Sequence, residues 1–189
     1  MNCASRPLAT LAAALALAGM LAACARDTEP AAEHNDADTQ FAQMMIVHHE
    51  GAIEMAELAV ERATTPEVKA LGERISAAQG PEIELMAGWL DDWDEAAPAE
   101  LDMEGMDHGG MDMDGMGQGE VMADLDGRAG TDFDDRFLAM MIAHHEGAIE
   151  MSEDELDDGQ NAEALELAQT IIDAQEAEIT EMEGLLADD

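Results

Sequence analysis

A motif that occurs twice constrains the fold of this chain more than any other feature. Residues 44–55 read Met-Met-Ile-Val-His-His-Glu-Gly-Ala-Ile-Glu-Met, and residues 140–151 repeat them with a single Val-to-Ala change. The same offset of 96 residues needs no gap and aligns further pairs, namely Phe41 with Phe137, Gln79 with Gln175, Glu82 with Glu178 and Met86 with Met182. Each half is therefore one supersecondary unit used twice.

The apolar residues of both halves recur with a helical period, and no alternating strand pattern is present. The predicted helices are 41–62, 66–93, 134–154 and 162–186. Thr65 with Pro66, and Asn161 in the second half, should begin the second helix of each hairpin, and residues 157–159 should form a turn. Two hairpins that each carry an apolar face close most simply into an all-α four-helix bundle.

The remaining segments lack a helical pattern. The Ala/Leu run that ends at Ala23 is too short to favour a permanent membrane span, and Leu21-Ala22-Ala23-Cys24 resembles a bacterial lipobox. The alternative is an ordinary signal peptide with a chance cysteine. The predicted organisation is a lipoprotein signal peptide at 1–23, a flexible tether at 24–37, and a duplicated bundle at 38–189, with repeat one at 38–95, a linker at 96–131 and repeat two at 132–189.

A lipid attached to Cys24 would hold the mature protein on a membrane outside the cytoplasm. The folded part then has no cysteine, so its soft metal ligands must be methionines, which suits an oxidising compartment. The formal net charge of −38 argues against nucleic acid and makes cations the natural small partners. The alternative is that this acidity reflects adaptation to a salty environment.

The linker concentrates methionine among Asp and Gly. Such a composition cannot pack a core, so residues 98–130 should be mobile. The candidate copper ligands here are Met103, Met106, His108, Met111, Met113 and Met116. Their spacing resembles the Met-rich segments of bacterial copper-handling proteins, whereas the alternative is a plain linker.

Helical geometry places the motif side chains on two neighbouring stripes. Met44, His48, Gly51 and Met55 share one, while Met45 and His49 lie on the next, with Glu50 and Glu54 facing solvent. Imidazole and thioether together select copper, in particular Cu(I), over Mg or Ca. On the second helix of each hairpin, Gln79 and Glu82, with their copies Gln175 and Glu178, lie on or at the edge of an apolar face. These residues could support the ligands, or could simply satisfy buried histidines by hydrogen bonds.

Several better-known sites are excluded by spacing. His49-Glu50 is not followed by the second histidine of a zinc metalloprotease helix, and no Glu-x-x-His of a ferritin-type di-iron site occurs. No Cys-x-x-Cys-His is present, so covalent haem is not expected. We expect a copper ion, and neither haem nor a nucleotide.

The two motifs, each followed by Gln-x-x-Glu-Ile-x-x-Met, resemble the domain of unknown function 305 family. The resemblance covers nearly the whole mature chain. It implies a ferritin-like bundle, an extracytoplasmic location and copper binding. Carried over to this sequence, it implies two ligand sets, which are Met44, Met45, His48, His49 and Met55 with Met86, and Met140, Met141, His144, His145 and Met151 with Met182.

Three functions compete. The first is an envelope lipoprotein that binds copper for sequestration, tolerance or delivery to a copper-transfer protein, and it would not be an enzyme. The second is a cuprous oxidase with an open coordination position, using Glu82 with His48. The third is a structural bundle whose histidines only form internal hydrogen bonds. The duplicated His and Met pattern favours the first.

Overall fold

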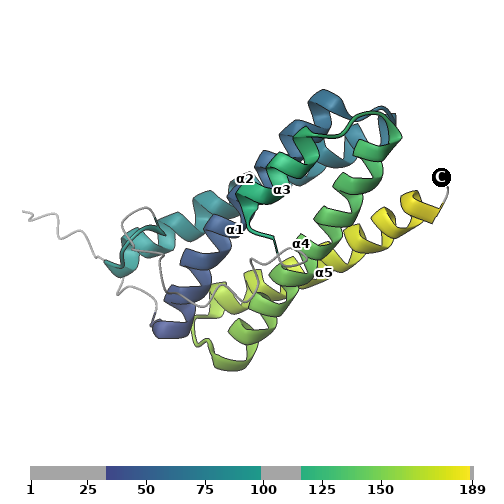
Figure 1. The fold of residues 1–189 in the computed structure, drawn as a ribbon. Helices are drawn as coiled ribbons and strands as arrows, with labels where there is room; N and C mark the ends of the chain where they lie inside the picture. The colour runs from purple at the N-terminus through teal and green to yellow at the C-terminus, as the bar shows by residue number, and fades with distance from the viewer. Residues whose placement is uncertain (1–32, 99–115, 188–189) are drawn as a thin grey trace, which may run out of the picture. The chain divides into compact units, whose positions relative to one another are not determined.

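The computed structural model describes residues 33–98 and 116–187, and within these ranges the chain forms five α-helices (Figure 1). The helices are α1 Asp36–Arg62, α2 Pro66–Trp93, α3 Gln118–Asp126, α4 Thr131–Asp158 and α5 Ala162–Ala187. The all-α prediction is confirmed, and α2 has the predicted bounds. The predicted lipidation site Cys24 lies outside the described residues, as do the predicted ligands Met103, Met106, His108, Met111 and Met113.

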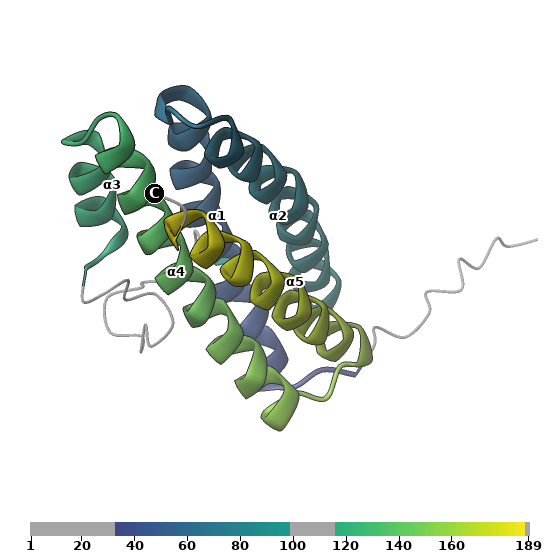
Figure 2. The same ribbon diagram turned by 90° about the vertical axis from the view of Figure 1, so that its right-hand side faces the viewer.

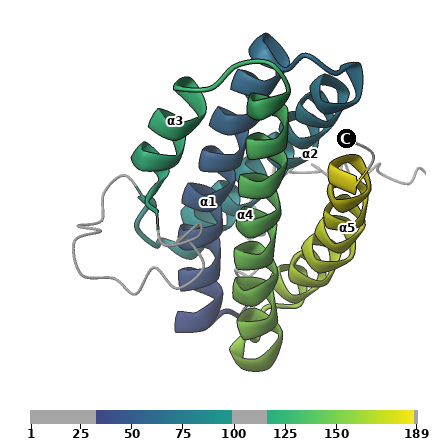
Figure 3. The same ribbon diagram turned by 45° about the vertical axis from the view of Figure 1, so that its right-hand side comes forward.

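The two predicted hairpins form and meet through their first helices. α1 packs on α2, α4 packs on α5, and α1 contacts α4, beside which it lies in Figures 2 and 3. Buried apolar side chains form two groups. Cluster one joins the C-terminal half of α1, from Ala52, to the N-terminal half of α4, up to Met141. Cluster two joins the N-terminal half of α1, up to Ile46, to Ala148 in the C-terminal half of α4. The two helices are therefore antiparallel.

Two buried aspartates tie each hairpin to the loop of the other. Asp134 on α4 accepts hydrogen bonds from the backbone N–H groups of Thr64 (2.9 Å) and Thr65 (2.8 Å), before α2. Its copy Asp38 on α1 accepts from the backbone of Gln160 (3.0 Å) and Asn161 (2.7 Å), before α5. Burial raises the pKa of both carboxyls, but these hydrogen bonds outweigh it, and the pKa of each is lowered.

The helix starts follow local capping. Asn35 caps α1, because its side-chain oxygen accepts from the backbone N–H groups of Ala37 and Asp38, so α1 begins before the predicted start at Phe41. The Asn161 cap of α5 is confirmed by bonds from Glu163 and Ala164. Thr65 occupies the N-cap position of α2, although its side chain makes no capping bond.

Two segments differ from the prediction. α4 continues to Asp158, so the loop before α5 begins at Gly159 rather than at Asp157. Part of the linker predicted to be mobile is the helix α3. Val121 and Leu125, spaced by one helical turn, are fully buried in cluster one and give α3 an apolar face. None of the described helices is long and apolar enough to cross a membrane.

Glu155 breaks the symmetry of the repeat. It is buried at 2% exposure on α4, whereas the equivalent position in α1 is the fully buried Ala59. Burial raises the pKa of Glu155 to about 8, and the neighbouring carboxylate of Asp38 contributes to the same shift. Glu155 is therefore a neutral acid at neutral pH, next to an ionised partner.

We expect this pair to make stability depend on pH. The pKa of Glu155 is about 8 in the folded chain against an ordinary value of 4.5, so its stabilising effect is complete at low pH and is lost as pH rises toward 8. The free energy of unfolding should fall by on the order of 1 kcal/mol per pH unit between about pH 5 and 8. Urea denaturation of Glu155→Gln should show a flatter profile, because glutamine stays neutral.

The matched control is Glu153→Gln, since Glu153 is exposed on the same helix. It should keep the pH dependence of the unchanged chain. Equal slopes for Glu155→Gln and Glu153→Gln would contradict a neutral, buried Glu155.

Candidate metal centre

Two buried histidines meet where α1 crosses α4. The ring centroids of His48 and His144 lie 3.6 Å apart at an interplanar angle of 43°. Both side chains are almost fully buried, at 3% and 2% exposure. These two residues occupy the same position in the two repeats, so equivalent positions face each other at the crossing. The structure thus brings together two of the predicted ligands, one from each half.

The neighbouring histidines are held by carboxylates. His49 Nε2 lies 2.7 Å from Glu82 Oε2, and His145 Nε2 lies 2.7 Å from Glu178 Oε2. Because a carboxylate only accepts, Nε2 carries the proton in both contacts. Within the described part of the chain, neither Nδ1 has a hydrogen-bond partner. A carboxylate that orients one ring nitrogen and leaves the other free is a common arrangement around metal-binding histidines.

The buried histidines at this crossing form a histidine layer of His48, His49, His144 and His145. The charge state of His144 in this layer follows from its burial. Burial lowers the pKa of His144 well below the ordinary value, and the neighbouring imidazoles of His48, His145 and His49 lower it further. The His144 ring is therefore neutral at neutral pH. A neutral imidazole is the form that ligates metals.

The motif methionines lie on both sides of the histidine layer, grouped across the repeats. Cluster one contains Met55 from the first half with three methionines of the second half, Met140, Met141 and Met182. Cluster two contains Met45 and Met86, and Met151 of the second half packs against it. The resemblance implied sets confined to one repeat, whereas the antiparallel crossing exchanges Met55 and Met151 between them. Met44 is also buried.

The polar residues of the second helices are placed as expected. Gln79 and Gln175 are each 3% exposed, and their side-chain oxygens have no hydrogen-bond partner among the residues the structure describes. Glu50 and Glu54 are exposed, as predicted. In residues 33–98 and 116–187, no three His, Cys, Asp or Glu side chains form a group that could hold a metal ion by themselves. Ligands at this crossing would combine imidazole with thioether.

Two residues that position the centre were not found from the sequence pattern. Asp38 and Asp134 fix the loops that lead into α5 and α2, the helices that carry Glu178 and Glu82. The signal that could have revealed them was their alignment at the repeat offset, combined with their place in the first turn of a helix.

The family model for the domain of unknown function DUF305 matches residues 38–186. The chain belongs to the DUF305 family. Among solved structures, a DUF305 fragment from Deinococcus radiodurans is 30% identical to this DUF305 protein, with a TM-score of 0.72 over 85% of this chain and 100% of the other. A DUF305 protein from Streptomyces coelicolor is 31% identical, with a TM-score of 0.71 over 80% of this chain and 91% of the other.

CopM in its Cu(II)-bound form is also similar to this DUF305 protein. The two are 32% identical, with a TM-score of 0.66 over 80% of this chain and 96% of CopM. Cu(I)-bound and Ag-bound forms of CopM match as well. Among curated proteins, none matches the chain. The predicted family is confirmed, and the bundle belongs to a fold in which one relative has been observed with copper.

The carboxylate–histidine pairs should contribute to stability without metal. Glu82→Ala would leave the Nε2 group of His49 buried without its partner, which costs about 1–3 kcal/mol. We expect Glu178→Ala to lose a similar amount, because its bond to His145 has the same length. Urea denaturation of metal-free protein measures both. Glu84→Ala, an exposed glutamate on α2, is the control, and equal stability of all three variants would contradict these pairs.

Proposed function

We propose that this DUF305 protein binds copper as Cu(I) through its central histidines and the methionines on either side of them. The observation that carries the proposal is the contact of His48 with His144 in a buried layer between two methionine-bearing clusters. The neutral imidazole of His144 is in the form that can offer a lone pair to a cation. The copper-bound forms of CopM support the same metal.

The ligand types favour a soft metal. Thioether sulfur and imidazole nitrogen suit Cu(I), whereas Mg and Ca require oxygen ligands. We propose two sites related by the repeat. The first uses the histidine layer with Met55, Met141 and Met182. The second uses the same layer with Met151, Met45 and Met86. His49 and His145 are oriented by Glu82 and Glu178, so their Nδ1 atoms are additional candidate ligands.

We place this function outside the cytoplasm, on a lipid anchor at Cys24. Methionine replaces cysteine as the soft ligand in the proposed bundle, which fits an oxidising compartment. The chain carries a large excess of acidic residues, 45 against 7 basic ones, and so attracts cations from solution. Sequestration, tolerance or delivery to a copper-transfer protein are the roles that such a binding protein could serve.

An oxidase is not part of this proposal. The oxidase hypothesis used Glu82 as a ligand beside His48, and Glu82 instead bonds to the buried His49 at 2.7 Å. That bond uses one carboxylate oxygen of Glu82 to orient His49. No other observation favours turnover over binding.

The central pair should carry most of the affinity. In an anaerobic Cu(I) competition titration of the full chain, His48→Ala with His144→Ala should weaken tight binding by about 100-fold, since direct ligands are lost. His34→Ala, which removes a histidine that stacks on Trp93, is the control and should bind as the unchanged chain does. Tight binding that survives the double substitution would overturn the assignment of these ligands.

The grouping of methionines can be tested by double substitutions. Met55→Leu and Met182→Leu should be non-additive in Cu(I) affinity, because both sulfurs would serve one site. Met55→Leu and Met86→Leu should be additive, because their clusters differ. The reverse pattern, with coupling between Met55 and Met86, would favour sets confined to one repeat.

A further inference from the structure

Among the residues that the structure describes, the helix α3 has no counterpart beside the first hairpin, so the described parts of the two halves are unequal. It begins at Gln118, in the linker between the repeats, and in Figure 3 it lies along α1. Its fully buried residues Val121 and Leu125 attach it to cluster one alone. Whatever α3 contributes therefore acts on one of the two methionine clusters.

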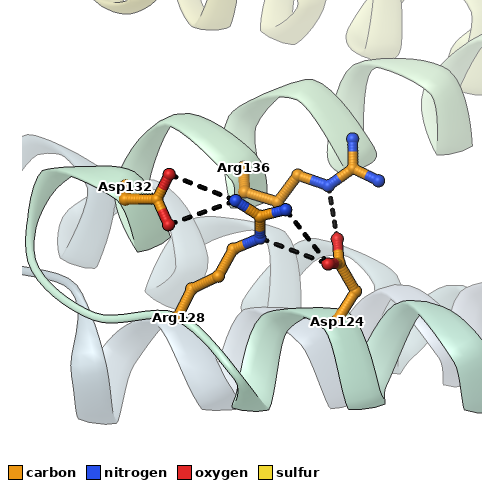
Figure 4. A network of polar contacts seen from close by, with 4 residues as sticks. All are labelled: Asp124, Arg128, Asp132 and Arg136. Carbon is orange, nitrogen blue, oxygen red and sulfur yellow. Dashed lines mark hydrogen bonds and ion pairs between the residues drawn. The ribbon is translucent and has the colours of Figure 1, made fainter.

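Arginines fix α3 at this place. Figure 4 shows Arg128 between Asp124 and Asp132. The nitrogen–oxygen distance is 3.1 Å to each aspartate, and Arg136 donates to Asp124. Arg62 of α1 also bonds to Asp126 of α3 at 2.8 Å. These are three of only seven basic residues in a chain of net charge −38. Single exposed ion pairs stabilise little, but a network on a buried apolar anchor holds a short helix in one position.

The first residue of α3 contacts the repeated motif itself. Gln118 Nε2 donates to the carbonyl oxygen of Gly51 at 3.1 Å and to Glu54 Oε2 at 2.9 Å. A Cβ atom on Gly51 would lie 2.9 Å from Gln118 Oε1, so the absence of a side chain permits this approach. Gly51 follows His48 by one helical turn. The start of α3 is therefore close along α1 to the central histidine pair.

Met116 lies two residues before Gln118. It is partly buried and packs against cluster one, the group that contains Met55, Met141 and Met182. Val121 and Leu125 already supply the apolar anchor of α3. The contact of Gln118 with Gly51 fixes the chain to α1 two residues after Met116.

We propose that Met116 is an additional copper ligand of the cluster-one site, and that Gln118 is the positioning residue that holds it there. The inference rests on the proposed copper binding and deepens it, because it makes the two sites unequal. The first site gains a thioether from outside the repeats, and therefore binds Cu(I) more tightly than the second. A thioether is selective for soft cations, so the gain applies to Cu(I) and not to hard divalent ions.

The experiment is an anaerobic Cu(I) competition titration of the full chain, with the sulfur coordination at one equivalent measured by X-ray absorption. Met116→Leu keeps the apolar packing and removes the sulfur. It should weaken the tighter equivalent by about tenfold and lower its sulfur count by one. Gln118→Ala and Gly51→Ala should weaken the same equivalent, and none of the three variants should change the other.

Two controls separate ligation from packing. Met122→Leu removes the methionine within α3, which also packs against cluster one. Gly88→Ala adds a methyl group where no atom lies within 4 Å, in contrast to Gly51. Both should bind Cu(I) as the unchanged chain does. Urea denaturation of every variant checks that α3 and the bundle remain folded.

The outcomes distinguish this inference from the proposed function. If the unchanged chain does not bind Cu(I) tightly, the proposed function fails, and this inference fails with it. If the unchanged chain binds tightly but Met116→Leu shows the same affinity and sulfur count, only the inference is overturned. It is also overturned if Met122→Leu weakens binding as much as Met116→Leu, because packing would then explain both.

Discussion

The antiparallel contact between α1 and α4 is the constraint on which the rest of the structure depends. Because the helices are copies, their crossing brings His48 onto His144, and it separates the buried methionines into two clusters on either side. Two imidazoles at 3.6 Å cannot both be protonated in a buried layer without strong repulsion. The crossing thus fixes the geometry of the candidate centre and excludes a state in which both central histidines are charged.

The carboxylates that support this crossing act at a distance from it. Asp38 and Asp134 each hold the loop of the opposite hairpin, and those loops set the start of α5 and α2. These two helices bring Glu178 and Glu82 to the neighbouring histidines. The orientation of a buried imidazole therefore depends on hydrogen bonds made at the ends of the helices, which links the stability of the bundle to the order of its centre.

Local features of the fold were predictable, and long-range ones were not. Pro66 and the helical period gave the bounds of α2, and Asn161 gave the start of α5, because capping depends on a few consecutive residues. The exchange of Met55 and Met151 between repeats depends on how α1 and α4 cross, which periodicity does not encode. Helix α3 was not predicted because it is short and its two buried residues lie in a segment dominated by Asp, Gly and Met.

The contact of α1 with α4 joins two copies of the same helix. A surface that meets its own copy about a two-fold axis is the isologous interface of a homodimer. A single hairpin would therefore carry both sides of the interface between α1 and α4. Joining the two hairpins in one chain frees each half to change alone. The second half has Glu155 where the first half has Ala59, and among the described residues only one side of the bundle carries a helix such as α3. A symmetric pair of separate hairpins could not make such changes in one half alone.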